Sequence, residues 1–134
     1  MGSKGTTMRP SRTWGFRLSS VDIAVILALV PATWMLLQMV GILAWGVPIV
    51  FGHFFLFCNV VRIQRWKELV WAGVFLVNAG AWAIGDDFWW AGVLYAQTPV
   101  TILLVWSDMR NPRYHGVFAR RINPKLEDYL EGRL

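Results

Sequence analysis

The chain has 134 residues, of which 56% are apolar and 16% are charged, and its net charge is +5. A soluble domain of this size has about a quarter charged residues, and three long runs of this chain, 23–61, 69–85 and 88–107, contain none. This segregation excludes a soluble enzyme, an intrinsically disordered chain and an extracellular disulfide scaffold, because each needs polar residues along its whole length. The composition predicts an integral membrane protein.

The first twenty residues form a short basic tail with no acidic residue. Ser20 is a favourable helix cap, and Asp22 in the first turn would face the positive end of the helix dipole. We therefore expect the first helix to begin at this point.

The uncharged run 23–61 is too long for one membrane span. Its 39 residues would extend about 58 Å as a single helix at 1.5 Å per residue, whereas the hydrocarbon core of a bilayer is about 30 Å thick. Gly41, Gly46 and Pro48 are residues that end one helix and start another. The pattern predicts two helices, 21–40 and 47–63, joined by a tight turn.

Two further helices are expected in the second half of the chain. A compact, mostly basic connection at 62–68 leads into a helix at 66–84, and a turn at 85–87 leads into a helix at 88–106. The predicted fold class is all-α: four transmembrane helices in two hairpins, followed by a short amphipathic C-terminal helix. The predicted divisions are a tail at 1–20, a membrane domain at 21–107 and a cytoplasmic segment at 108–134.

The basic residues give the orientation. All thirteen lie in the N-terminal tail, in 62–68 or after residue 107, and none lies in the turns at 41–47 and 85–87. The positive-inside rule then places both termini in the cytoplasm of a multi-pass plasma or inner membrane protein. We expect contact with anionic lipid headgroups, and not with nucleic acid, through Arg9, Arg12, Arg17, Arg62, Arg65, Lys67, Arg110, Arg113, Arg120 and Arg121.

The C-terminal segment combines a basic stretch at 110–121 with a helical pattern after Asn123-Pro124. The pattern predicts an amphipathic helix of about ten residues, which is too short to be stable alone in water. It would dock on lipid headgroups, on the 62–68 connection or on a partner protein. The apolar positions that would make this contact are Leu126, Tyr129, Leu130 and Leu134.

Polar side chains inside a membrane are costly and are candidates for function. Here they are Gln38 in the first predicted helix and, in the other three, the members of a possible polar layer: His53, Asn59, Asn78, Gln97, Thr98 and Thr101. They would either bond to one another and fix the helix register, or line a polar path or small-ligand site. The uncharged interior argues against a proton-coupled antiporter, a carboxylate metal site and an intramembrane protease.

His53 has a second interpretation, as a ligand of a haem-like or chlorophyll-like cofactor. A haem with two histidine ligands would need His115, which lies in the cytoplasmic segment. Ligation by His53 alone stays open, but we predict neither a cofactor nor a metal. The adjacent acids Asp86 and Asp87 would attract a cation or simply be solvated.

Small residues in the third helix would allow another helix to approach closely. They are Ala72, Gly73, Ala79, Gly80 and Ala83. With no catalytic residues predicted, the leading hypothesis is a non-catalytic accessory or scaffold subunit of a larger membrane protein complex. The alternatives are a homo-oligomeric small channel or transporter that uses the polar layer, and a cofactor-binding membrane subunit.

Overall fold

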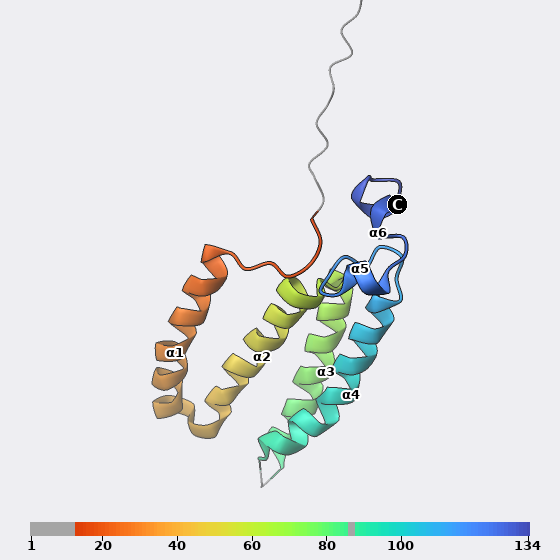
Figure 1. Cartoon of the computed structure of the whole chain (residues 1–134). Helices are drawn as coiled ribbons and strands as arrows, with labels where there is room; N and C mark the ends of the chain where they lie inside the picture. The colour runs from red at the N-terminus through yellow and green to blue at the C-terminus, as the bar shows by residue number, and fades with distance from the viewer. Residues whose placement is uncertain (1–12, 86–87) are drawn as a thin grey trace, which may run out of the picture.

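The computed structural model describes residues 13–85 and 88–134, and these form helices joined by turns, with no strand among them (Figure 1). The predicted all-α class is confirmed. Four long helices lie side by side in alternating directions, and two short helices cover one end of the layer.

Helix α1, Ser20–Val40, begins with a reciprocal cap. The Asp22 amide donates to Ser19 Oγ at 3.2 Å, and the Ser19 amide donates to Asp22 Oδ2 at 2.7 Å. The N-cap is therefore Ser19, whereas the sequence predicted Ser20. Asp22 decides between the two adjacent serines, because its side chain reaches back three residues to the cap.

The expected break follows α1. A tight 3-10 turn, Gly41–Trp45, reverses the chain, and Gly41 at its start has φ 59°, a conformation that favours glycine. Helix α2, Gly46–Phe55, then runs back beside α1 and continues as a wider π-helical turn, Leu56–Val61. The sequence predicted the hairpin but not the π-helical turn.

By length and composition, one helical stretch of the described chain is long and apolar enough to cross a membrane. It is the 42-residue stretch Ser20–Val61. The turn at Gly41–Trp45 folds this stretch into the α1–α2 hairpin.

Helices α3, Arg65–Ile84, and α4, Trp90–Met109, form the second antiparallel pair. They correspond to the predicted ranges 66–84 and 88–106, with α4 displaced by two or three residues toward the C-terminus. Because the helices run in opposite directions, the start of α3 lies next to the end of α4.

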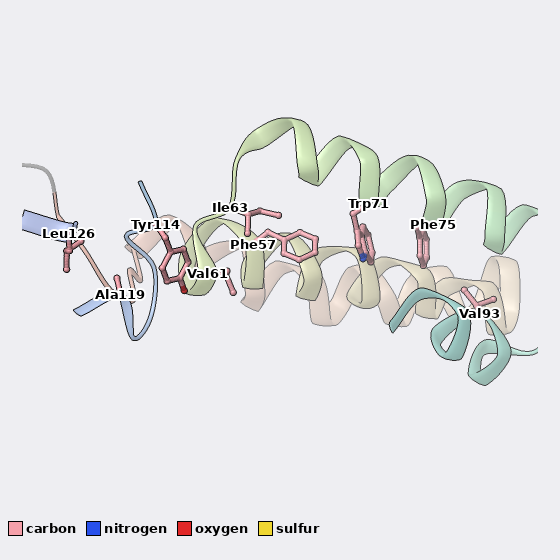
Figure 2. Packing of buried hydrophobic residues seen from close by; sticks show 9 residues of the cluster. All are labelled: Phe57, Val61, Ile63, Trp71, Phe75, Val93, Tyr114, Ala119 and Leu126. Carbon is pink, nitrogen blue, oxygen red and sulfur yellow. The ribbon is translucent and has the colours of Figure 1, made fainter. Parts of the chain in front are cut away.

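The buried core joins α2, α3 and α4 and continues under the C-terminal segment (Figure 2). Trp71, which is fully buried, is its centre. The Trp71 ring stacks on Phe75 with centroids 5.2 Å apart and meets the edge of Phe57 at 5.7 Å. Aromatic pairs in these arrangements contribute beyond the area that they bury, so they hold α2 against α3.

The C-terminal segment folds onto the end of this layer. It contains α5, Ala119–Ile122, and α6, Leu126–Leu130, so the helix predicted to have about ten residues has five. Gly132 has φ 75° and turns the chain away from a helical path. The Val117 amide donates to the Val60 carbonyl at 2.8 Å, which attaches the segment to the end of α2.

Candidate functional site

The polar side chains predicted to form a layer lie mostly between α3 and α4, where they bond across the helix pair. Asn78 Nδ2 donates to the Val93 carbonyl at 2.8 Å, and Gln97 Nε2 donates to the Trp71 carbonyl at 3.1 Å. The Trp71 indole in turn donates to Thr101 Oγ1 at 2.8 Å. These bonds connect residues in opposite order along two antiparallel helices and therefore fix the register of the pair.

The threonines of this layer also bond within α4. Thr101 Oγ1 donates to the Gln97 carbonyl at 3.3 Å, and Thr98 Oγ1 donates to the Leu94 carbonyl at 2.7 Å. Side-chain hydroxyls commonly bond to the preceding turn of a helix in this way. Their hydrogen-bonding capacity is thus used within the chain.

Gln97 differs from its neighbours in one atom. Its side chain is buried, and Oε1 has no hydrogen-bond partner in the described structure. A buried acceptor without a donor is destabilising. The Gln97 amide therefore has a hydrogen bond from Nε2 but none to Oε1.

Asn59 lies apart from the layer. Its Nδ2 donates to Asp22 Oδ1 at 3.4 Å, which joins the end of α2 to the start of α1. Asn59 therefore does not join the polar layer between α3 and α4; it lies in the π-helical turn at 56–61, which departs from the geometry of a regular α-helix.

His53 faces the aromatic core. Its ring stacks on Trp71 with centroids 4.4 Å apart and approaches Phe57 at 6.1 Å. Nδ1 lies 2.9 Å from the Ile49 carbonyl, and since a carbonyl only accepts, Nδ1 carries the proton. With Nδ1 bonded in this way, Nε2 is the ring nitrogen that could bind a metal, and the stacked ring is equally suited to packing.

A buried ion pair lies at the end where α3 begins and α4 ends. Lys67 Nζ is 2.8 Å from Asp108 Oδ1 and donates to Ser107 Oγ at 3.1 Å, and each charged side chain is only 4% exposed. The sequence placed Lys67 at the lipid surface, but here its ammonium group is enclosed by protein. The antiparallel arrangement supplies the reason, since it brings the start of one helix to the end of the next.

The other predicted lipid-surface residues lie mostly on the outside. Arg62 is half-buried and donates to the Thr13 carbonyl at 2.8 Å. Arg110 and Arg120 lie over the rings of Trp106 and Trp14, an arrangement that attracts a cation to the aromatic face. The remaining described members of the set are exposed: Arg17, Arg65, Arg113 and Arg121. Arg9, Arg12 and the acids Asp86 and Asp87 lie outside the described residues.

The small residues of α3 divide into two faces. Ala72 and Ala79 pack against the core. Gly73 and Gly80 point away from it, and a Cβ atom at either position would meet nothing within 4 Å. Ala83 is exposed.

The apolar positions of the C-terminal segment contact their own chain. Leu126 is buried, and Tyr129 and Leu130 pack against the same core cluster. The Tyr129 ring also stacks on His115 with centroids 4.7 Å apart. Leu134 is half-buried. The C-terminal segment thus docks on the chain's own core.

No family model, no curated protein and no solved structure matches this chain. Inference about its function therefore rests on its own geometry.

Proposed function

We propose that the chain spans the membrane four times and that both termini are cytoplasmic. In Figure 1 the start of α1, the end of α2, the start of α3 and the end of α4 lie at one end of the molecule, together with the C-terminal segment. The described basic residues flank the helices at these points. Charge on one side and apolar helices between is the arrangement that the positive-inside rule describes.

Within that membrane the proposed role is that of a non-catalytic accessory or scaffold subunit. The observation that carries this proposal is the glycine face of α3, where Gly73 and Gly80 are seven residues apart and have open space beside them. A glycine inside a helix is destabilising by about 1 kcal/mol relative to alanine. Close approach of another helix offsets such a cost in membrane proteins, and no helix among the described residues occupies the position.

The apolar residues beside these glycines extend the same surface. Leu69, Leu76 and Val77 are 71%, 70% and 75% exposed. A partner helix lying along α3 would cover them together with the glycines. The proposed partner is another membrane-spanning protein.

Site-specific photocrosslinking at position 73, in intact membranes, tests this role. We expect an adduct between the chain and a different membrane protein. A crosslinker at Ile102, an exposed apolar position on α4, is the control and should give little adduct. Gly73→Leu and Gly80→Leu should each abolish recovery of the same protein in mild detergent, because the added side chain prevents close approach of the partner helix. Each side chain is added in open space, so the fold should stay intact.

The mass of the adduct separates this proposal from its alternatives. An adduct of two copies of the 15.3 kDa chain would favour a homo-oligomer and contradict the accessory role. Equal adducts from positions 73 and 102 would mean that the glycine face has no special partner. We do not propose a channel, because the hydrogen bonds of the polar layer connect α3 to α4.

A further inference from the structure

A long apolar groove lies between α1 and α2. It has a volume of about 880 Å³. One wall runs from Asp22 to Leu37 on α1, and the other runs from Trp45 to Asn59 along α2 and the π-helical turn. Gly52 forms part of the wall, and a Cβ atom at that position would meet nothing within 4 Å. In a bilayer such a groove is filled, because empty space beside apolar side chains forfeits their dispersion contacts.

The dimensions of the groove indicate what fills it. The volume lies within the range of small-molecule sites, about 300–1,000 Å³. The α1 wall from Asp22 to Leu37 is about 22 Å long at a rise of 1.5 Å per residue. An apolar space of this length and volume accommodates flexible hydrocarbon chains.

A second, polar pocket adjoins one end of the groove. It has a volume of about 350 Å³ and shares Cys58 with the groove. Its lining is formed by Cys58, Arg62, Ile63, Arg65, Glu68 and His115. An apolar groove that continues into a charged pocket is suited to bind an amphiphile, which has an apolar tail and a polar headgroup.

The charges of this pocket define the headgroup. Arg62 and Arg65 present guanidinium groups, which match phosphate oxygens. Arg62 uses Nη1 on the Thr13 carbonyl, but a guanidinium has five N–H donors in all. Glu68 supplies a carboxylate in the same lining and accepts from Cys58 Sγ at 3.2 Å through Oε1. A purely anionic headgroup would meet repulsion from Glu68.

A headgroup with both a phosphate and a primary ammonium group matches both signs of charge. A quaternary ammonium group fits less well, because it has no N–H to donate and is usually held by an aromatic cage; this pocket is lined by no Trp, Tyr or Phe. Asp22, at the same end of the groove, already accepts hydrogen bonds from Ser19 and Asn59.

We propose that one phospholipid of the ethanolamine type binds here, with its acyl chains along the α1–α2 groove, its phosphate at Arg62 and Arg65, and its ammonium group at Glu68. Neither Gly73 nor Gly80 lines the groove or the polar pocket, so the site is separate from the glycine face. The proposal rests on the membrane location inferred above and goes beyond the accessory role.

Native mass spectrometry of the full-length protein tests the site. The protein would be placed in phosphatidylcholine nanodiscs with equal fractions of phosphatidylethanolamine and phosphatidylglycerol, and the lipids that remain bound after release would be counted. We expect one phosphatidylethanolamine per chain, favoured about tenfold over phosphatidylglycerol.

Three variants localise the binding. Gly52→Leu should reduce lipid retention about tenfold by filling the groove, and Gly73→Leu, which adds the same side chain on the other face, is the matched control and should leave retention unchanged. Arg65→Gln should keep a bound lipid but remove the preference for phosphatidylethanolamine. Circular dichroism checks the fold, and Val30→Trp, at a groove position that is 69% exposed, fills the groove from α1 if Gly52→Leu is not folded.

Each contrary outcome has a definite meaning. A wild-type protein that retains no lipid, or a groove-filled variant that retains as much as Gly73→Leu, overturns the site. Equal retention of the two lipids overturns the headgroup assignment. A protein absent from the membrane fraction overturns the membrane location as well, whereas a membrane protein without bound lipid rejects only this inference.

Discussion

Helix α1 and the α3–α4 pair have similar lengths and similarly apolar sequences, but they differ in what they bury. Helix α1 has no buried residue along its 21 positions, whereas α3 and α4 together bury seven, including Trp71, Val93 and Gln97. Side-chain hydrogen bonds connect α3 to α4 at several levels, while α1 meets the end of α2 through the Asn59–Asp22 contact. Apolar composition alone therefore does not distinguish a helix that packs in the core from one that stays exposed.

The difference in burial indicates that the two regions contribute unequally to stability. The α2–α3–α4 layer keeps its shape through stacked rings and bonds between its own residues. Helix α1 is attached by the turn that follows it and by the Asn59–Asp22 contact at its start, and none of its residues is buried in the core. Substitutions should therefore have large effects on stability in the layer and small ones in α1.

The largest expected effect is at the buried ion pair. Lys67→Ala leaves the Asp108 carboxylate buried without its cation, and breaking such a pair typically costs about 3–5 kcal/mol of unfolding free energy. Arg65→Ala, two residues away and exposed, should change stability by less than about 0.5 kcal/mol. Unfolding in mixed detergent micelles measures both.

A double variant tests the cause of that loss. Replacing Lys67 with Met and Asp108 with Leu removes both charges, and we expect it to recover most of the stability lost by Lys67→Ala. If the double variant is no more stable than Lys67→Ala, then packing around the lysine chain, rather than the unpaired charge, stabilises this end of the layer.

Two tryptophans compare the regions directly. Trp71→Ala should destabilise the protein by about 3 kcal/mol, through an unfilled cavity and the lost bond to Thr101. Trp34→Ala, on α1 and 65% exposed, should cost less than about 0.5 kcal/mol. Equal losses in the same unfolding assay would contradict the distinction between α1 and the layer.

The sequence predicted the hairpins well because their signals are local. Gly41 and Pro48 mark the first reversal, and uncharged runs separate the long helices. The antiparallel order of α3 and α4 follows from these signals, and it brings Lys67 next to Asp108. The two residues are far apart in the sequence and flank different helices, so the charge pattern alone predicted that Lys67 lies at the surface.

Other features depend on contacts that periodicity does not encode. The π-helical turn at 56–61 sends Asn59 to Asp22. Gly116 lies so close to the Val61 carbonyl that a Cβ atom would be 2.0 Å from its oxygen. This close approach arises only when the C-terminal segment docks on the end of α2, and no sequence pattern predicts it. The basic residues of the segment therefore predicted contact with lipid headgroups instead. The groove likewise depends on the distance between α1 and α2, which apolar composition does not predict.

Tyr114 tests whether the C-terminal segment belongs to the packed region. Its hydroxyl donates to the Val117 carbonyl at 2.8 Å, so Tyr114→Phe should cost about 1 kcal/mol. Burial, and then the charge of Asp108, raise the pKa of Tyr114. A raised folded-state pKa means that its stabilising contribution is complete below the unfolded value of about 10 and is lost as pH rises through the folded value.

The measurement is protection of the C-terminal amides from hydrogen exchange as a function of pH. We expect the wild type to lose protection of residues 114–123 above about pH 10, relative to Tyr114→Phe, which has no phenol to ionise. Parallel pH profiles for the two proteins would mean that Tyr114 does not hold the segment.

The smallest expected effect separates two members of the polar layer. Asn78→Leu removes the bond to the Val93 carbonyl, and side-chain hydrogen bonds in membranes average about 0.6 kcal/mol. Gln97→Leu removes the bond to the Trp71 carbonyl, but it also removes the buried Oε1 that has no partner, so its net cost should be lower and close to zero. Unfolding in mixed micelles, with Thr98→Val as a control for an exposed hydroxyl, resolves the order. A larger loss for Gln97→Leu than for Asn78→Leu would mean that Oε1 is hydrogen-bonded in the membrane, and it would favour a polar path between α3 and α4 over a layer whose purpose is to fix their register.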